Sequence, residues 1–455
     1  MTSLTTLLRM GSGAAGAQQR KISTIHNNVA NASTEGYRRQ RTSLETLGGA
    51  VGGQMLGVTT GERRSIDAPL ADRFVPEYRG ESGHHRAKLE IATFAEGLVN
   101  GEGGDLSGRL GGFFASVREL ESNPGDATTR REFVERAKTL AQGVQQRHGA
   151  LTRARELGQQ KAGDTVNSIN AKLSQIAAYD QEIMSGQGGP EAVDARDKLV
   201  SQVSDSIGAR VVPGKNGAVN LITQDGAALV EGGRARPLSL EVSAAGDMAL
   251  KSSNGRTLGK IGGELGGIFE ADRDVIGAQL NDLETFARDF ANEANAVHSQ
   301  GFGLDGNSGR PLFTFNAGAA SSSLAVAQEI VDDPGLVAAS STAGNVPGGN
   351  INIQALAALQ EASIIGGGGG VAGKTPQDAL LQSATSLGQV IETTSLELEA
   401  SEGALAHLED VQASISGVSL EEELVAMTEA KHAFEASAKL ISVADEMLST
   451  VLSLR

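Results

Sequence analysis

Apolar residues at heptad spacing predict a helix at each end of the chain. Near the carboxyl end, one apolar residue recurs every seven positions, at Leu420, Met427, Phe434, Ile441 and Leu448. A companion series that includes Leu424 and Leu452 is mixed, and Ala430, Ala444 and Val451 widen the stripe. Near the amino end the same period runs through Leu8, Ala15, Ile22 and Val29, with Ile25 beside it. A single narrow stripe is typical of coiled-coil packing, although a helix lying on a globular core would show it too. Because neither helix can bury its stripe alone, the pattern favours pairing of the two ends.

Apolar stripes between the ends predict three more long helices. They cover residues 106–120, 128–184 and 380–415, and the first of them ends before Pro124. In the second, Gly143, Gly149 and Gly158 predict a break or bend. Its apolar stripe is interrupted by Asp180. The helix at the carboxyl end has a marked start, because Ser419 precedes Glu422 by three residues, as in a capping box.

From residue 207 to 263 the pattern changes to short β-prone pieces separated by turns. The pieces are 210–212, 219–223 and 238–242, and Pro213-Gly214 and Asn216-Gly217 are typical of the turns between strands. We therefore expect a mainly α fold with a small inserted antiparallel β domain. The predicted domains are paired terminal helices (1–47 with 408–455), a long helical bundle (48–206 with 267–407) and a β-rich outer domain (207–266).

Composition narrows the kind of core and the kind of partner. The 455 residues include no Trp and no Cys, and only 3% are aromatic, so burial must rest on Leu, Ile, Val and Ala, which suit closely packed helices. The absence of Cys excludes disulfides and thiolate chemistry. A formal net charge of −16 argues against nucleic acid and anionic membranes as partners. Neither a membrane span nor a secretory signal peptide is recognisable.

No residue pattern predicts a catalytic, metal or cofactor site. The seven histidines are scattered, without a second ligand at helical spacing. The stretch Gly301–Gly306 matches the dinucleotide glycine pattern, but it follows a helical stretch and runs into Pro311, so we interpret it as a turn. A nucleotide-linked enzyme using this turn is the alternative. The basic cluster Arg38, Arg39 and Arg41 is expected to meet acidic neighbours in a protein assembly.

Two terminal motifs resemble those of the rod, hook and hook-associated proteins of bacterial flagella. The first is NNVANASTEGYRRQ, from Asn27 to Gln40, and the second runs from Ser416 to Leu448. The first motif departs from the family pattern at His26 and Glu35, where a small residue and a proline are usual. Two internal segments, 194–200 and 297–313, resemble the hook-associated members of the family.

The resemblance implies a structural subunit that joins hook to filament and uses no cofactor. It implies export through the flagellar type III apparatus to an extracellular position, with terminal helices that fold on assembly in an inner tube. The implied partners are copies of itself, hook protein, a second junction protein or filament subunits, and an export chaperone at the carboxyl-terminal helix. Alternatives are a hook or distal rod subunit and, from another class, a cytosolic coiled-coil scaffold.

Together the stripes and the motifs predict an assembly interface. It comprises Leu8, Ile22, Ile25, Asn28, Val29, Asn31, Gly36, Tyr37, Leu420, Leu424, Met427, Phe434, Ile441, Leu448 and Leu452.

Overall fold

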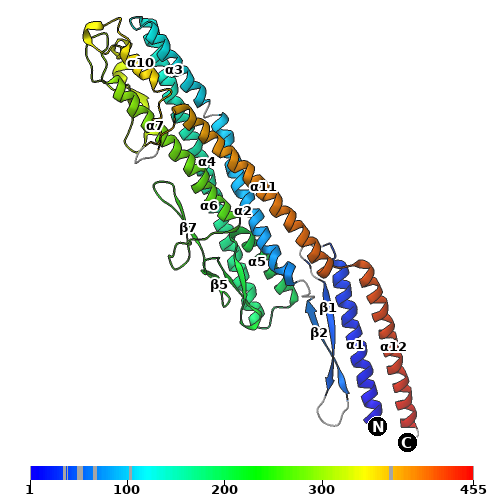
Figure 1. Ribbon diagram of the computed structural model, residues 1–455. Helices are drawn as coiled ribbons and strands as arrows, with labels where there is room; N and C mark the ends of the chain where they lie inside the picture. Colours follow the sequence, from blue (N-terminus) through cyan, green and yellow to red (C-terminus); the bar gives the residue numbers. More distant parts are fainter. Residues whose placement is uncertain are drawn as a thin grey trace. The chain divides into compact units, whose positions relative to one another are not determined.

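The computed structural model describes residues 2–33, 37, 39–48, 55–64, 69–101, 105–367 and 372–453. Its internal contacts divide the chain into two compact units. The terminal unit comprises Met1–Tyr78 and Gly403–Arg455, and the central unit comprises Arg79–Glu402. The fold is mainly α with a small antiparallel β region, which confirms the predicted fold class (Figure 1). The division into three domains remains a prediction.

The terminal unit is built around the two ends of the chain. Helix α1 (Thr2–Ala30) lies beside α12 (Leu420–Ser453) and also contacts the hairpin of β1 (Gln40–Gly48) and β2 (Met55–Arg64) (Figure 1). The strands are antiparallel, with Gln40 opposite Arg64. The predicted pairing of terminal helices is therefore present within one chain. At the start of α12, the Glu422 amide donates to Ser419 Oγ at 3.4 Å, as one half of the expected capping box.

Two long helices belong to both units. Helix α2 (Pro69–Gly101) enters the central unit after Tyr78, and α11 (Pro376–Ser416) leaves it after Glu402. Within the terminal unit, Val75 of α2 is buried against Leu405 and Leu408 of α11. The central helical bundle is completed by α3 (Leu106–Ser122), α4 (Ala127–Met184), α5 (Pro190–Ile207), α6 (Gly263–Glu270), the π-helical turn η2 (Ala271–Ile276) and α7 (Gly277–His298).

Helix α4 is continuous over 58 residues, so the predicted break is wrong. It spans about 87 Å at 1.5 Å per residue. One of its glycines lets a neighbouring helix approach closely. A methyl group at Gly143 would lie 2.7 Å from Arg109 Cδ of α3, whereas one at Gly158 would make an ordinary contact of 3.6 Å with Ile91 Cδ1 of α2. The apolar seams on both sides of α4 supply packing that outweighs the low helix propensity of glycine.

Several of the phenylalanines are gathered in one cluster. Phe113 and Phe114 of α3, Phe133 of α4 and Phe290 of α7 are buried within one cluster. Ring centroids lie 5.6 Å apart for Phe113 and Phe133 and 5.7 Å apart for Phe113 and Phe290. Such edge and tilted contacts add to the free energy of apolar burial. An aromatic-poor chain therefore still has an aromatic core where α3, α4 and α7 meet.

The β-rich segment packs on α4, close to α5 (Figure 1). Strands β3 (Arg210–Pro213), β4 (Val219–Ile222), β5 (Ala228–Glu231) and β6 (Arg234–Ala235) form an antiparallel sheet in sequence order. Strands β7 (Ser239–Val242) and β8 (Met248–Lys251) form a separate hairpin. The turn η1 (Lys215–Gly217) between β3 and β4 uses positive φ values of 53° at Asn216 and 81° at Gly217, as the Asn-Gly pair predicts.

The polar interruption of the α4 stripe has a partner on α5. Asp180 is fully buried and accepts a hydrogen bond of 3.2 Å from Arg196 Nη1. It also accepts one of 3.2 Å from the Val219 amide, and the same Arg196 nitrogen donates to the Gly217 carbonyl at 2.6 Å. Burial raises the pKa of Asp180, although these donors oppose the shift. One ion pair thus joins α4, α5 and the first turn of the β-rich segment.

The glycine-rich stretch after α7 is a turn, as predicted. The Gly306 amide donates to the Gly303 carbonyl at 3.0 Å, and a methyl group on Gly301 would lie 2.1 Å from Asn352 Nδ2. Short elements follow within residues 313–358: β9 (Phe313–Thr314), α8 (Ala320–Ser323), β10 (Ala325–Val326), α9 (Gln328–Asp332), η3 (Pro334–Leu336), η4 (Ala343–Asn345) and α10 (Ile351–Ala358). The glycines of this stretch serve chain reversal and close packing, and no helix follows to face a phosphate.

Candidate assembly interface

The two terminal helices meet through small side chains. On α1, Gly11 and Ala17 are buried, and on α12 the buried positions include Ala430, Ser437 and Ala444. The Ser437 hydroxyl is satisfied within its own helix, donating to the Ala433 carbonyl at 2.8 Å. Small residues let two helix backbones approach closely, so dispersion contacts replace long interlocking side chains.

The most buried positions of α12 lie three residues from the predicted seam, although Ile441 of that seam contacts α1, where a methyl group on Gly11 would lie 2.8 Å from its Cγ1. The most enclosed positions are Glu423, Ala430, Ser437 and Ala444, a heptad series in its own right. Within the predicted series, Met427, Ile441 and Leu448 are half-buried, whereas Leu420 and Phe434 are 51% and 36% exposed. The sequence analysis placed the seam on the largest apolar side chains, whereas most of the enclosed residues of α12 are small. The heptad repeat of Ala430, Ser437 and Ala444 is the sequence signal that indicates this second series.

Asn28 joins the amino-terminal motif to the start of α12. Its side chain is buried, and Nδ2 donates to the Gln40 carbonyl at 2.9 Å and to Glu423 Oε2 at 3.1 Å. Its Oδ1 accepts hydrogen bonds from Tyr37 Oη at 2.9 Å and from the Gln40 amide at 3.0 Å. The side-chain amide therefore uses both donors and both acceptor positions. A fully satisfied buried amide specifies one arrangement of the elements that it joins.

Arg39 supplies the charge that balances the buried Glu423. Its Nε donates to Glu423 Oε1 at 2.6 Å, and its Nη1 donates to Glu422 Oε2 at 2.6 Å. Burial lowers the pKa of Arg39, but the hydrogen bonds to Glu422 and Glu423 outweigh this effect and raise the pKa above its usual value. Its amide also donates to the Ser416 carbonyl at 2.9 Å. One member of the predicted basic cluster therefore meets acidic residues of its own chain; Arg38 lies outside the described residues.

The helix pair leaves large apolar side chains of α12 in solvent. Leu424 is 58% exposed, and further exposed side chains are Leu420, Val425, Leu440, Val443 and Met447. These residues flank the small-residue seam on both sides of α12. A helix that is apolar on its outward sides needs additional partners to bury them.

The remaining predicted interface residues are distributed between buried and partly exposed positions. Ile25 is buried, whereas Leu8, Ile22, Val29, Asn31 and Tyr37 are half-buried. The contacts of α1 with β1, β2 and α12 cover several sides of this helix. Gly36 and the side chain of Leu452 lie outside the described residues.

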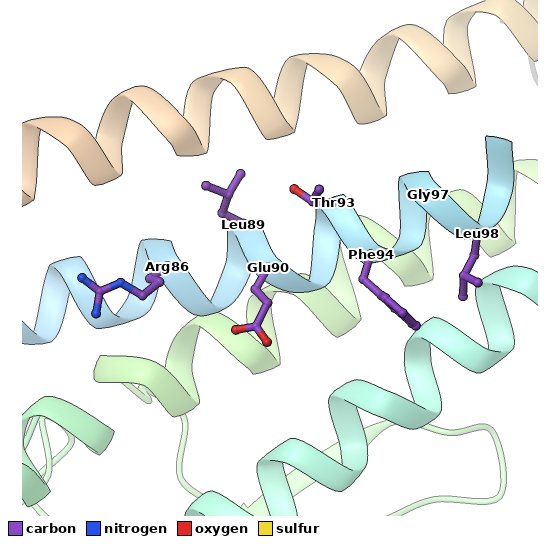
Figure 2. A pocket seen from close by; sticks show the side chains of 7 residues that line it. All are labelled: Arg86, Leu89, Glu90, Thr93, Phe94, Gly97 and Leu98. Atoms are coloured by element: carbon purple, nitrogen blue, oxygen red, sulfur yellow. The ribbon is translucent and has the colours of Figure 1, made fainter. Parts of the chain in front are cut away.

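The central unit carries a separate shallow groove along α2. Figure 2 shows its lining, with Leu89 and Thr93 projecting to one side of the helix and Phe94 and Leu98 to the other. The charged residues at this groove are already paired, Arg86 with Glu402 at 2.5 Å and Glu90 with Lys161. The groove thus offers apolar surface and no free acid or base.

Over the part of the chain that the structure describes, no helix is long and apolar enough to cross a membrane. Within the same residues, no cluster of three or more His, Asp or Glu side chains is arranged to hold a metal ion.

Three family models match different parts of the chain. The model of the basal body rod protein of flagella matches residues 8–38, and that of the C-terminal part of the flagellar basal body rod FlgEFG proteins matches residues 413–454. These two matches contain α12 and the network residues Asn28, Tyr37, Glu422 and Glu423, whereas Arg39 lies one residue beyond the first match. The model of the helical domain of flagellar hook-associated protein FlgK matches residues 93–313.

Several known proteins are similar to the chain. Flagellar hook-associated protein 1 of Bacillus subtilis is 27% identical over 100% of this chain and 99% of its own length. The protein of the same name from Salmonella typhimurium is 27% identical over 69% of this chain, and the match spans only 60% of that relative. The flagellar hook junction protein FlgK from Burkholderia pseudomallei shares the fold, with a TM-score of 0.50 and 23% identity over 53% of this chain and 46% of that one.

The paired ends and their matches define a structural protein of the bacterial flagellar axis. Together with the central match, they make the chain similar along its length to the FlgK family of flagellar hook-associated proteins. This is a structural family and not a family of enzymes. The similarity indicates association with other axial proteins of the flagellum.

Proposed function

We propose that this chain is the structural subunit that joins the flagellar hook to the filament. The observation that carries the proposal is the outward apolar surface of α12, where Leu424 and Val425 are 58% and 60% exposed beside a seam that is already packed on α1. Such a surface is costly for a protein that stays monomeric. Neighbouring axial subunits would cover it. The proposed neighbours are further copies of this chain, hook protein, and a second junction protein or filament subunits.

The central unit favours a position at the hook–filament junction over a position in the hook or the rod. Its match is to the helical domain of FlgK, and the similar protein from Burkholderia pseudomallei bears the name of a hook junction protein. Hook and rod subunits share the terminal motifs, so those motifs alone do not distinguish the positions. We infer the junction from residues 93–313.

Export before folding is the second part of the proposal. Helix α1 contains Gly11, Gly13 and Gly16, which disfavour an isolated helix, and its packing on α12 uses small side chains. A helix pair of this kind gains most of its burial from neighbours in an assembly. The chain would thus pass unfolded through the flagellar type III apparatus, with a chaperone holding α12, and order its ends at an extracellular site.

The deciding experiment uses cells that lack their own copy of this protein. A chain truncated before Leu420 is expected to keep a folded central unit but to be absent from sheared flagella. Phe434→Asp, which adds a charge beside the seam, should block incorporation while the monomer stays soluble. Phe434→Leu, which keeps an apolar side chain at the same position, is the matched control and should incorporate. Incorporation of the truncated chain or of Phe434→Asp at wild-type levels would contradict the proposal.

A further inference from the structure

The two paired helices carry opposite charges. Helix α1 contains Arg9, Arg20 and Lys21 and not one acidic residue. Helix α12 contains two lysines and seven carboxylates, at positions Glu421, Glu422, Glu423, Glu429, Glu435, Asp445 and Glu446. Within a chain of formal charge −16, α1 is therefore a local cationic element.

These charges are not neutralised between the two helices of one copy. The helices meet through Gly11, Ala17, Ala430, Ser437 and Ala444, which leaves the charged residues on the outward sides. Among the described residues, neither Arg9 nor Arg20 forms an ion pair, and both are exposed. On α12 the ion pairs that the structure describes involve Arg39 with Glu422 and Glu423, and His432 with Glu435.

The acidic side of α12 is also a shaped, partly apolar surface. A shallow hollow there is lined by Arg39, Glu421, Glu422, Val425, Ala426 and Glu429. Val425 is 60% exposed within it, and Glu421 and Glu429 are exposed as well. Apolar area with acidic residues around it fits a helix that carries small and cationic side chains. The outward side of α1, with Arg9, Ser12, Arg20 and Ser23, has this chemistry.

We propose that the cationic side of α1 in one copy docks on the acidic hollow of α12 in a second copy of this chain. The inference rests on the proposed function, because it names the contact through which copies associate. The contact is heterologous, since two different surfaces meet, and repetition of such a contact builds a ring or a helical array. Peripheral charge pairs of this kind steer association and fix the register, while the apolar surface supplies affinity.

Engineered cysteines test the geometry, because the chain has no natural cysteine. Ser23→Cys on the outward side of α1 and Val425→Cys in the hollow of α12 are both at exposed positions. Cells producing both single variants of the full-length chain should give, in isolated flagella, disulfide-linked pairs of one variant with the other. Cells producing one variant alone are the control and should give at least tenfold fewer pairs. Cross-links that form mainly between like positions would overturn the proposal.

Charge reversal tests the electrostatic part. Arg9→Glu with Arg20→Glu, or Glu421→Lys with Glu429→Lys, should each lower incorporation into flagella at least tenfold. The chain carrying all four changes should recover most of it, because its acidic α1 then meets a basic α12. Incorporation of either double variant at wild-type levels would refute the α1–α12 contact. Failure of the fourfold variant to recover would refute it as well, and would indicate that another protein occupies the α12 hollow. Absence of even the wild-type chain from flagella would instead refute the proposed function.

Discussion

Asn28 of α1 donates a hydrogen bond of 3.1 Å to Glu423 of α12, although 395 positions separate the two residues in sequence. The bond joins the end of the first helix to the first turn of the last one. Arg39 and Tyr37 complete the group, and Asn28 also fixes the backbone of Gln40. The amino-terminal motif thus acts as a clasp on α12, and its polar residues are explained by this contact.

Removal of Glu423 should open this clasp. Glu423→Ala leaves Arg39 without its most buried partner and Asn28 with an unused donor, at an expected cost of about 3 kcal/mol in the stability of the helix pair. Faster hydrogen exchange at the amides of α1 and α12, with the central unit unchanged, is the measurement. Glu421→Ala, in the same turn but exposed, is the matched control and should exchange as the wild type does. Equal exchange in both variants would refute the clasp.

The same substitution at two glycines of α1 should have opposite effects. Gly16→Ala meets no atom within 4 Å and gains helix propensity of about 1 kcal/mol. Gly11→Ala places its methyl group 2.8 Å from Ile441 Cγ1, and overpacking of this kind costs about 1–3 kcal/mol. Thermal unfolding of the terminal unit should thus shift upward for Gly16→Ala relative to Gly11→Ala. Ile441→Ala added to Gly11→Ala should remove the clash; no recovery would show that the helices do not pack at this point.

The Asp180–Arg196 pair should show strong coupling in a double-mutant cycle. Asp180→Ala removes the buried carboxylate partner of Arg196, leaves it only the 41% exposed Asp197, and removes the acceptor of the Val219 amide, which should cost about 3 kcal/mol. Replacing both residues with apolar ones, Asp180→Leu with Arg196→Met, should be much less harmful than the sum of the single changes. Denaturant unfolding of the four chains measures this. Additive effects would mean that the two residues act independently.

Acid should destabilise the central unit through His298. The side chain is 1% exposed, with Nδ1 2.9 Å from the Arg310 carbonyl and Nε2 accepting from the Ala338 amide at 3.0 Å. Burial lowers the pKa of His298 to about 4. An unfolded histidine titrates at about 6.5, so between these pH values only the unfolded chain takes up the proton. The free energy of unfolding thus has its full value above about pH 6.5 and falls by about 3 kcal/mol as the pH drops to 4.

A neutral replacement tests this dependence on pH. His298→Gln keeps a donor and an acceptor but cannot be protonated, so its stability should fall less steeply between pH 6.5 and 4. His432→Gln, with a side chain that is 75% exposed, serves as the control and should follow the wild type. Denaturant unfolding at several pH values decides the matter. Parallel curves for wild type and His298→Gln would exclude His298 as the source.

Sequence patterns predicted the elements better than their contacts. Heptads, turn residues and the Ser419 cap indicated most of the long helices, the β-rich segment and the pairing of the ends, but neither α2 nor the β1–β2 hairpin was predicted. They did not predict that Glu423 would be buried, because a carboxylate in an acidic first turn is normally solvated. Its partners Asn28 and Arg39 are nearly 400 positions away. In the same way, the sequence showed Asp180 only as an interruption of an apolar stripe, because its partner Arg196 lies on another helix and meets it only in the folded chain. Ala430 and Ala444 were predicted only to widen the stripe, and Ser437 was not assigned to it, because Ala and Ser carry little apolar signal.

The continuity of α4 has a mechanical consequence. This helix runs without interruption from the aromatic cluster at Phe133 to the ion pair at Asp180, and its glycine at 143 is packed closely against Arg109 of α3. A rod with no internal joint transmits torque and bending load along its whole length. Under load we then expect bending to occur in the loops that flank α4, at 123–126 and 185–189, and not within the helix itself.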